Sequence, residues 1–317
     1  DLSESDIRLG AREYLLQRRT MLEGAQLEEE IRMNPFTEKE VFMSAAASSL
    51  YNSFKINQQI DFLSYNQLTE RGNLVWEDGH EFYKEILDSR GEVSDIKLSR
   101  VIWIPNENGK FEKVKGWTPK ECNNVYQNNG YFFPNGNYSV RIGCDPFKFG
   151  NRDVKGRRKS NGGGAMFYKH DPSIDFQEKP IDQWISNKFV VTYNTRVDDG
   201  NTYCEDMLKL AILFGAHVYP ERNVPIVIEK FREWGYEGYL LFDIDPNGKL
   251  AQAPGRYTGE ADKEQIFTEY MNYIKVFGRS DNHIEMLEEC LEINDPTEMT
   301  NYDLFAAGGM ALLGAKS

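Results

Sequence analysis

The sequence has little of what disulfide-bonded, zinc-binding or membrane-spanning proteins need. It contains four cysteines and four histidines in 317 residues. The cysteines are far apart and form no CxxC pair, so we predict neither a zinc ribbon nor a disulfide framework and expect a reducing cytoplasm. The histidines show no HExxH or other metal-ligand spacing. No apolar run approaches the roughly 18–20 residues of a membrane span and no signal peptide opens the sequence, so we expect neither membrane insertion nor secretion.

Positive charge is also scarce. The chain has 37 Lys and Arg against 50 Asp and Glu, a net charge of −13, which argues against broad electrostatic affinity for nucleic acid but permits a local basic patch. No GxxxxGK[ST] phosphate-binding loop occurs, so ATP hydrolysis is not predicted. An aromatic content of 13% excludes a disordered chain, and the length allows about two domains.

Three parts follow from the pattern along the chain. Residues 1–65 are predicted to be helical, beginning with a charged amphipathic helix over 4–32. Residues 66–137 are β-rich, with a strand, a turn and a returning strand over 101–114, and end in loops rich in Asn, Gly and Pro. Residues 138–317 form the third part, where the pattern becomes α/β.

The order of elements in this third part is informative. Strands are expected near 138–145, 164–168 and 188–193 as an antiparallel meander, followed by alternating helices and strands up to a final helix over 302–313. This is the order of an RNase H-like fold. The prediction is therefore an α/β protein with a mixed sheet, a three-stranded meander plus parallel strands, flanked by helices and preceded by a helical and β-rich extension.

Three acidic residues occupy special positions in that order. Asp145 ends the first strand of the α/β part, Glu221 follows the strand 216–219, and Asp303 opens the last helix. If the first and fourth strands are parallel neighbours, their carboxyl ends lie together, where ligand sites on open α/β sheets usually form. The small residues Ala306 to Gly309 would let the last helix approach the sheet and direct Asp303 toward the other two acids.

Such a cluster of carboxylates needs positive charge. Three carboxylates within a few ångströms repel one another by about 4 kcal/mol per pair at an effective dielectric constant near 20. Ligation by oxygen alone points to Mg²⁺ or Mn²⁺, and two such ions can clamp the attacking and leaving oxygens of a phosphodiester hydrolysis. Asp145, Glu221 and Asp303 are therefore the predicted catalytic and metal-binding residues, with two divalent cations as cofactors.

Each acid also has a simpler interpretation. Asp145 precedes a proline and would suit a turn, Glu221 would suit a solvated strand end, and Asp303 would suit a helix cap, because Thr300 and Asp303 have the spacing of a capping box. Two further patterns are rejected. The stretch DIDPNG at 243–248 resembles a calcium loop but has Pro254 at its twelfth position, and Asp95 with Lys97 repeats a nuclease DxK element without a clear βαβ context.

A basic stretch follows Asp145 in the sequence. It carries six positive charges, which are predicted to contact DNA phosphates: Lys148, Arg152, Lys155, Arg157, Arg158 and Lys159. The alternative is a solvated basic hairpin.

The acidic motifs resemble those of a known family. Asp145 in IGCDP, Glu221 in VYPERN and Asp303 in YDLFAA are similar to the three acidic motifs of the nuclease domain of tailed-bacteriophage terminase large subunits. The stretches YNTR at 193–196, APGRYT at 253–258 and RMNPFTEKEVF at 32–42 also resemble segments of that family. The likeness begins near residue 28 and is strongest over 139–315. Tyr302 stands where the family often has a further aspartate, so no fourth metal ligand is assigned, and Asp199 stays outside the core set.

This resemblance implies a metal-dependent endonuclease that cleaves concatemeric viral double-stranded DNA during genome packaging, in the cytoplasm of an infected bacterial host. It also implies a portal protein, a small terminase subunit and an ATPase motor domain as partners, with residues 1–65 as a remnant or linker of that motor domain. The sequence leaves three alternatives: a non-catalytic DNA-gripping or docking module, another RNase H-like nuclease such as a junction resolvase, and a carboxylate-pair glycosidase that needs no metal.

Overall fold

The computed structural model describes residues 10–22, 24–36, 53–77, 100–117, 123, 125–134, 139–147, 161–175, 184–244, 248–293 and 295–316. The chain divides into two compact units, Asp1–Gln58 and Gln59–Ser317.

The first unit contains two helices where the sequence predicted one over 4–32. They are α1 (Ala11–Met21) and α2 (Gly24–Met33). The single-helix prediction is wrong because Leu22, at the end of α1, has an extended backbone, and α2 starts afresh at a glycine, a poor residue for a helix interior. An ion pair of 2.9 Å between Arg18 Nε and Glu30 Oε2 joins the two helices.

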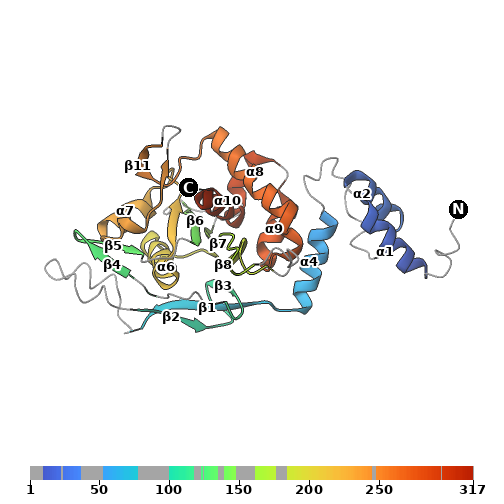
Figure 1. Ribbon diagram of the computed structural model, residues 1–317, viewed down its shortest axis with the longest axis horizontal. Helices are drawn as coiled ribbons and strands as arrows, with labels where there is room; N and C mark the ends of the chain where they lie inside the picture. The colour runs from blue at the N-terminus through green and yellow to red at the C-terminus, as the bar shows by residue number, and fades with distance from the viewer. Residues whose placement is uncertain are drawn as a thin grey trace. The chain divides into compact units, whose positions relative to one another are not determined.

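The second unit is built on a seven-stranded sheet in the order β2-β1-β3-β8-β7-β6-β9. Its strands are β1 (Thr69–Trp76), β2 (Val101–Pro105), β3 (Phe111–Val114), β6 (Val140–Asp145), β7 (Gly162–Tyr168), β8 (Lys188–Thr195) and β9 (His217–Pro220). Two ribbons pair β4 (Val125–Asn128) with β5 (Tyr131–Pro134), and β10 (Phe242–Ile244) with β11 (Leu250–Pro254). Figure 1 shows the sheet with helices around it.

The helices of this part of the chain follow the sequence pattern closely. They are α4 (Ser53–Tyr65), α6 (Gly200–Phe214), α7 (Ile226–Glu233), α8 (Glu260–Phe277), α9 (Ile284–Glu292) and α10 (Asp303–Lys316), with short 3₁₀ helices at Glu237–Tyr239, Gly278–Ser280 and Pro296–Asn301. The helix α4 crosses the boundary between the two units, and its residue Gln59 donates to the carbonyl oxygen of Asp281 over 2.7 Å. Among the described residues, no helix is long and apolar enough to cross a membrane.

The predicted meander and its parallel neighbour are confirmed. Strand β7 pairs antiparallel with both β6 and β8, and β9 pairs parallel with β6. Beyond β9, the backbone N–H of Leu241 donates to the carbonyl oxygen of Val218 over 2.8 Å, so the chain leading into β10 continues the order. The mixed α/β sheet flanked by helices is therefore present, and β6 lies in it between β7 and β9.

The β-rich region 66–137 differs from the prediction. The strands expected as a strand and its return, β2 and β3, do not pair with each other, because β1 lies between them and pairs antiparallel with both. Strand β3 then pairs with β8, so strands from 66–137 and from 138–317 form one sheet inside one compact unit. The boundary expected at residue 137 does not separate two bodies.

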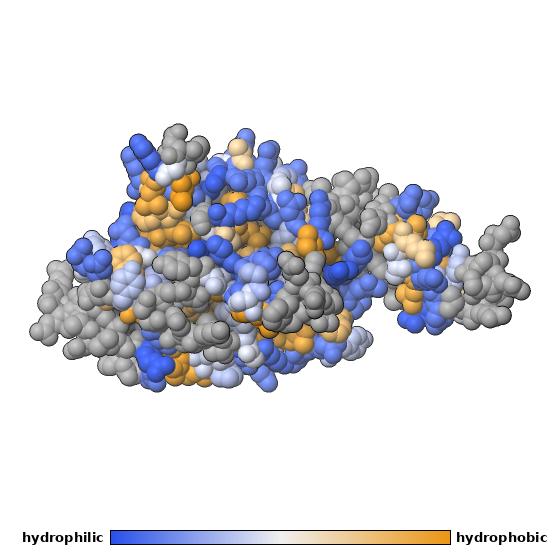
Figure 2. Space-filling view, viewed as in Figure 1, coloured by the Kyte–Doolittle hydropathy of each residue, from blue (hydrophilic) through white to orange (hydrophobic). Residues whose placement is uncertain are grey.

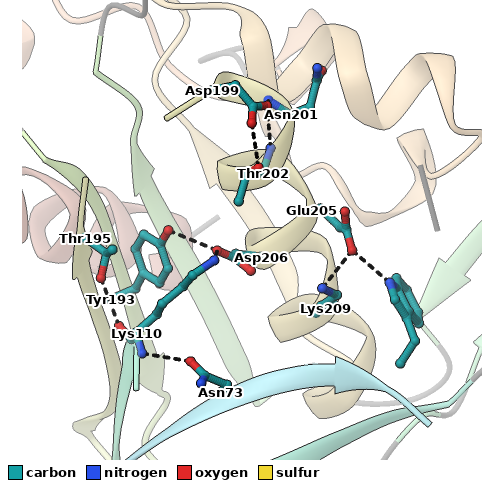
Figure 3. A network of polar contacts seen from close by, with 11 residues as sticks. Asn73, Lys110, Tyr193, Thr195, Asp199, Asn201, Thr202, Glu205, Asp206 and Lys209 are labelled. Atoms are coloured by element: carbon teal, nitrogen blue, oxygen red, sulfur yellow. Dashed lines mark hydrogen bonds and ion pairs between the residues drawn. The ribbon is translucent and has the colours of Figure 1, made fainter. Parts of the chain in front are cut away.

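A polar network joins this region to the rest of the sheet (Figure 3). Lys110 Nζ lies 2.7 Å from Asp206 Oδ2 on α6, and the hydroxyl of Tyr193 on β8 donates to the same oxygen over 3.1 Å. The backbone N–H of Lys110 donates to Asn73 of β1 over 3.0 Å. Residues of β1, β8 and α6 thus meet around one lysine just before β3, which explains why the β-rich region is not a separate part.

Glycines in β7 reveal what lies on each face of the sheet. A Cβ added at Gly162 or Gly164 would contact Tyr203 or Met207 of α6, whereas one added at Gly163 would lie 2.2 Å from the carbonyl oxygen of Asp303. Because side chains alternate along a strand, α6 covers one face and the start of α10 covers the other. Helix α10 packs against β6 and β7, as expected from its small residues.

Candidate carboxylate site

The side chains of Asp145 and Glu221 project from neighbouring parallel strands toward the same face. Asp145 is the last residue of β6, two residues after Gly143, whose added Cβ would meet α10. Glu221 follows β9, and its backbone N–H donates to the carbonyl oxygen of Cys144 over 3.2 Å. It lies two residues after Tyr219, which packs against Gly314 of α10. By strand alternation, both acids face α10 at the carboxyl ends of β6 and β9.

The third acid, Asp303, reaches this edge because the strand residues that face the first turns of α10 are glycines. A Cβ at Gly143 would lie 2.0 Å from the carbonyl oxygen of Ala307, so only glycine lets α10 lie this close to β6. Gly163, which pairs with Asp145, leaves the same space for the first turn of the helix. The small residues Gly308 and Gly309, expected to face the sheet, instead admit Tyr270 and Ile266 of α8.

Asp303 has a structural partner as well. Its Oδ2 accepts a hydrogen bond of 2.9 Å from the backbone N–H of Asn161, just before β7. The side chain of Asn161 donates to Asn194 Oδ1 of β8 over 2.9 Å. The position of Asp303 is therefore tied to the edge of the meander as well as to its own helix.

The electrostatics of Asp145 show that the acids interact. Burial raises the pKa of Asp145 well above its ordinary value, and the negative charges of Glu221 and Asp303 raise it further. A side-chain hydrogen bond with Glu221 and the charge of Glu289 act in the same direction. The carboxyl of Asp145 therefore binds a proton more readily than an ordinary aspartate does, because its pKa is raised.

The geometry joins the predicted acids in two ways. Asp145 and Glu221 are in hydrogen-bond contact, and Asp303 interacts with Asp145 through its charge. Within the part of the chain that the structure describes, no group of three or more His, Cys, Asp or Glu side chains is arranged to hold a metal ion. The donor chemistry nevertheless fits Mg²⁺ or Mn²⁺, since the side chains that interact here are carboxylates, the oxygen ligands that these cations prefer.

Glu289 is an acid of this site that the sequence analysis missed. It lies on α9 and is 6% exposed, and its Oε2 accepts a hydrogen bond of 2.7 Å from the backbone N–H of Phe305 in the first turn of α10. A carboxylate is stabilised at a helix N-terminus. The signal was present in the sequence, because Glu289 shares the apolar stripe of α9 with Met286 and Ile293.

Asp199, the residue left outside the predicted set, caps helix α6. Its Oδ1 accepts from the backbone N–H groups of Asn201 and Thr202, and its Oδ2 accepts from the Thr202 hydroxyl over 2.7 Å (Figure 3). The hydroxyl bond is the main cause that lowers the pKa of Asp199. This is the role of an N-cap residue, which accounts for its position without a metal.

Of the other sequence patterns, the structure describes only part. The six basic residues Lys148, Arg152, Lys155, Arg157, Arg158 and Lys159 lie outside the described residues, as do Asp95 and Lys97. Asp243 lies in β10, as predicted for a strand, and accepts from the hydroxyl of Tyr219. The β10–β11 ribbon pairs Ile244 with Leu250, both exposed, and Figure 2 shows apolar surface in this area.

Comparison with known proteins adds no relative: no family model, no curated protein and no solved structure matches this chain.

Proposed function

We propose that this chain is a metal-dependent DNA endonuclease with an RNase H-like fold. The observation that carries the proposal is the meeting of Asp145, Glu221 and Asp303 at one edge of the sheet. Three elements far apart in the sequence, β6, β9 and α10, each contribute one acid. The raised pKa of Asp145, caused by burial and then by the other two acids, supports a cluster suited to cations.

The topology supports the same proposal. The order β8-β7-β6-β9, with an antiparallel meander and one parallel neighbour, is the strand order expected for an RNase H-like sheet. The three acids of the resembling motifs stand at the ends of these elements: Asp145 ends β6, Glu221 follows β9 and Asp303 begins α10.

The chain's own residues would divide the work as follows. Asp145 interacts with both other acids, so it would contact both cations. Glu221 and Asp303 would each complete the ligands of one cation. Bound divalent cations would supply the positive charge that activates a water and stabilises the phosphorane-like charge during hydrolysis. Glu289 and Asn161 would keep the first turn of α10 in place beneath Asp303.

The biological setting follows from the sequence motifs. Their likeness to terminase nuclease domains supports cleavage of concatemeric viral double-stranded DNA during packaging, in the host cytoplasm, by two-metal-ion hydrolysis. The portal protein, the small terminase subunit and an ATPase motor domain are the corresponding partners. The basic stretch between Lys148 and Lys159 would contact the DNA phosphates.

A cleavage assay with a matched control tests the proposal. The variant Asp145→Asn should abolish Mn²⁺-dependent cutting of plasmid DNA and keep the circular dichroism spectrum of the folded protein. The control Asp198→Asn removes the same charge from an exposed position and should cut as the wild type does. Undiminished cutting by Asp145→Asn would reject the site. A branched DNA substrate in the same assay separates a junction resolvase from a nuclease that cuts linear duplex.

A second candidate function is a non-catalytic DNA-gripping or docking module. The hydrogen bond from Asn161 to Asp303 favours it, because it gives Asp303 a purely structural use, as does the lack of a prearranged metal group among the described residues. Calorimetric titration with Mn²⁺ separates the two candidates. A nuclease should bind Mn²⁺ in a way that Asp145→Asn removes, whereas a docking module should show no such binding.

A further inference from the structure

The backbone that carries Glu221 is held by a second segment of the chain. The N–H of Arg222 donates to the carbonyl oxygen of Arg256 over 2.8 Å, and the N–H of Arg256 donates to that of Pro220 over 3.0 Å. The guanidinium of Arg222 reaches back to the carbonyl oxygen of Pro254 over 2.9 Å. The chain just before α8 therefore runs alongside the end of β9 and fixes where the side chain of Glu221 begins.

Close approach of these two segments requires a glycine. Gly255 has a φ of +70°, and a Cβ at this position would lie 2.1 Å from the carbonyl oxygen of Pro220. Both features exclude other residues without strain. This local geometry then brings Thr258, three residues later and 7% exposed, against Glu221.

The Thr258 side chain touches Glu221 directly. Its hydroxyl donates to Glu221 Oε1. The same hydroxyl accepts from Asn223 Nδ2 over 2.5 Å, and Nδ2 also donates to the carbonyl oxygen of Thr258 over 3.1 Å. The backbone N–H of Thr258 donates to Asn223 Oδ1 over 3.3 Å. Three hydrogen bonds thus join Asn223 to Thr258, and a fourth joins Thr258 to Glu221.

The direction of each hydrogen bond in this group is determined. A backbone N–H only donates and a backbone carbonyl only accepts, so the amide of Asn223 must present its oxygen to the first and its NH₂ to the second. That NH₂ cannot accept a hydrogen bond, so the Thr258 hydroxyl must accept from it. The Glu221 carboxylate only accepts, so the single hydroxyl proton of Thr258 is directed at its Oε1.

We infer that Thr258, with its hydroxyl oriented by Asn223, is a positioning residue that holds the Glu221 carboxylate in the orientation in which it meets Asp145. The inference rests on the proposed function, in which Glu221 is a cation ligand. Hydrogen-bond partners behind a ligand fix its orientation, and their loss weakens metal binding. Thr258 acts through Glu221.

The experiment is calorimetric titration of the full chain with Mn²⁺ alone. Thr258→Val keeps the shape of the side chain but removes the hydroxyl, and should weaken Mn²⁺ affinity about 10- to 100-fold. Thr258→Ser restores the hydroxyl and should return the affinity to within about threefold of the wild type. Asn223→Ala leaves the hydroxyl in place but frees its rotation, so its affinity should fall between those of the two threonine variants. Thermal melting of each variant reports folding separately.

The outcomes separate this inference from the proposed function. A wild type that binds Mn²⁺ and a folded Thr258→Val that binds equally well would overturn the role of Thr258 alone. A wild type without Mn²⁺ binding would overturn both. If Thr258→Val fails to fold, Asn223→Ala, a change at an exposed residue, decides: affinity equal to that of the wild type would reject the orienting group.

Discussion

A carboxylate with a raised pKa lies on each side of the central sheet. Burial is the main cause that raises the pKa of Asp206 on the α6 face and of Asp145 on the α10 face. Their neighbours differ. Lys110, Lys209 and Tyr193 lower the pKa of Asp206 and oppose the effect of burial, whereas the groups around Asp145 are further carboxylates that raise it more.

This difference separates a structural carboxylate from one suited to a ligand. Asp206 receives its positive charge and hydrogen bonds from the fold itself, so it stabilises the junction between β3, β8 and α6 (Figure 3). The charged groups that shift the pKa of Asp145 are Glu221, Asp303 and Glu289, all of them acidic, so a bound proton or cation would relieve their repulsion. The same fold thus contains a carboxylate paired with a lysine on one face and, among the described residues, a cluster of interacting carboxylates on the other.

The largest expected effect is on the α6 face. Lys110→Met leaves the nearly buried Asp206 carboxylate without its cation and should lower the free energy of unfolding by about 2–3 kcal/mol, a value reduced because Lys110 is itself 34% exposed. Urea unfolding measures it. The double variant Lys110→Met with Asp206→Asn should recover part of the loss. A double variant as unstable as the single one would contradict the charge explanation.

Two adjacent glycines of β7 provide the next test, one for each face. Gly163→Ala places a methyl group 2.2 Å from the carbonyl oxygen of Asp303, and should cost about 1–3 kcal/mol and weaken Mn²⁺ binding as α10 moves away. Gly164→Ala meets the flexible side chain of Met207 at 3.0 Å and should cost less than about 1 kcal/mol. Equal effects of the two variants on unfolding and on Mn²⁺ titration would show that the two faces do not differ in this way.

The last expected effect is a gain in stability rather than a loss. The folded-state pKa of Asp145 lies above its unfolded value near 3.8, so the protonated carboxyl stabilises the fold below that pH and the contribution is lost as the pH rises through the folded pKa. Asp145→Asn removes this loss and should raise the free energy of unfolding by about 1–2 kcal/mol at neutral pH without metal.

Urea unfolding of wild type and Asp145→Asn at several pH values measures that gain. The advantage of Asp145→Asn should be smallest near the unfolded pKa and grow with pH, and added Mn²⁺ should raise the melting temperature of the wild type alone. Parallel pH profiles for the two proteins would contradict the raised pKa of Asp145.

Local patterns were sufficient for much of the fold. Alternation of apolar residues over 140–144 predicts strand β6, helical spacing predicts α6 and α8, and the order of these elements predicts the meander. The insertion of β1 between β2 and β3 was not predictable, since strand pairing depends on partners distant in sequence. Asp145, Glu221 and Asp303 were identified because each lies at the end or start of a predicted element.

Two further residues that interact with these acids, Glu289 and Thr258, were not identified from the sequence. Glu289 approaches Asp145 only because α9 packs against α10, and Thr258 reaches Glu221 only because the chain before α8 turns back along β9. No local spacing encodes either contact. For Asp199 the reverse holds, because a residue that was considered as a metal ligand is the N-cap of α6, a role set by its immediate neighbours in the sequence.

The amino-acid sequence by itself predicted most strands and helices of the α/β part and the acids that stand at their ends, because period, capping and turn preferences act over a few residues. Only the tertiary structure decided which carboxylates receive a positive partner. Lys110 is 96 residues from Asp206 in the sequence, and Glu221 and Asp303 are 76 and 158 residues from Asp145. Charge compensation depends on distances of a few ångströms, which only the packing of distant segments sets.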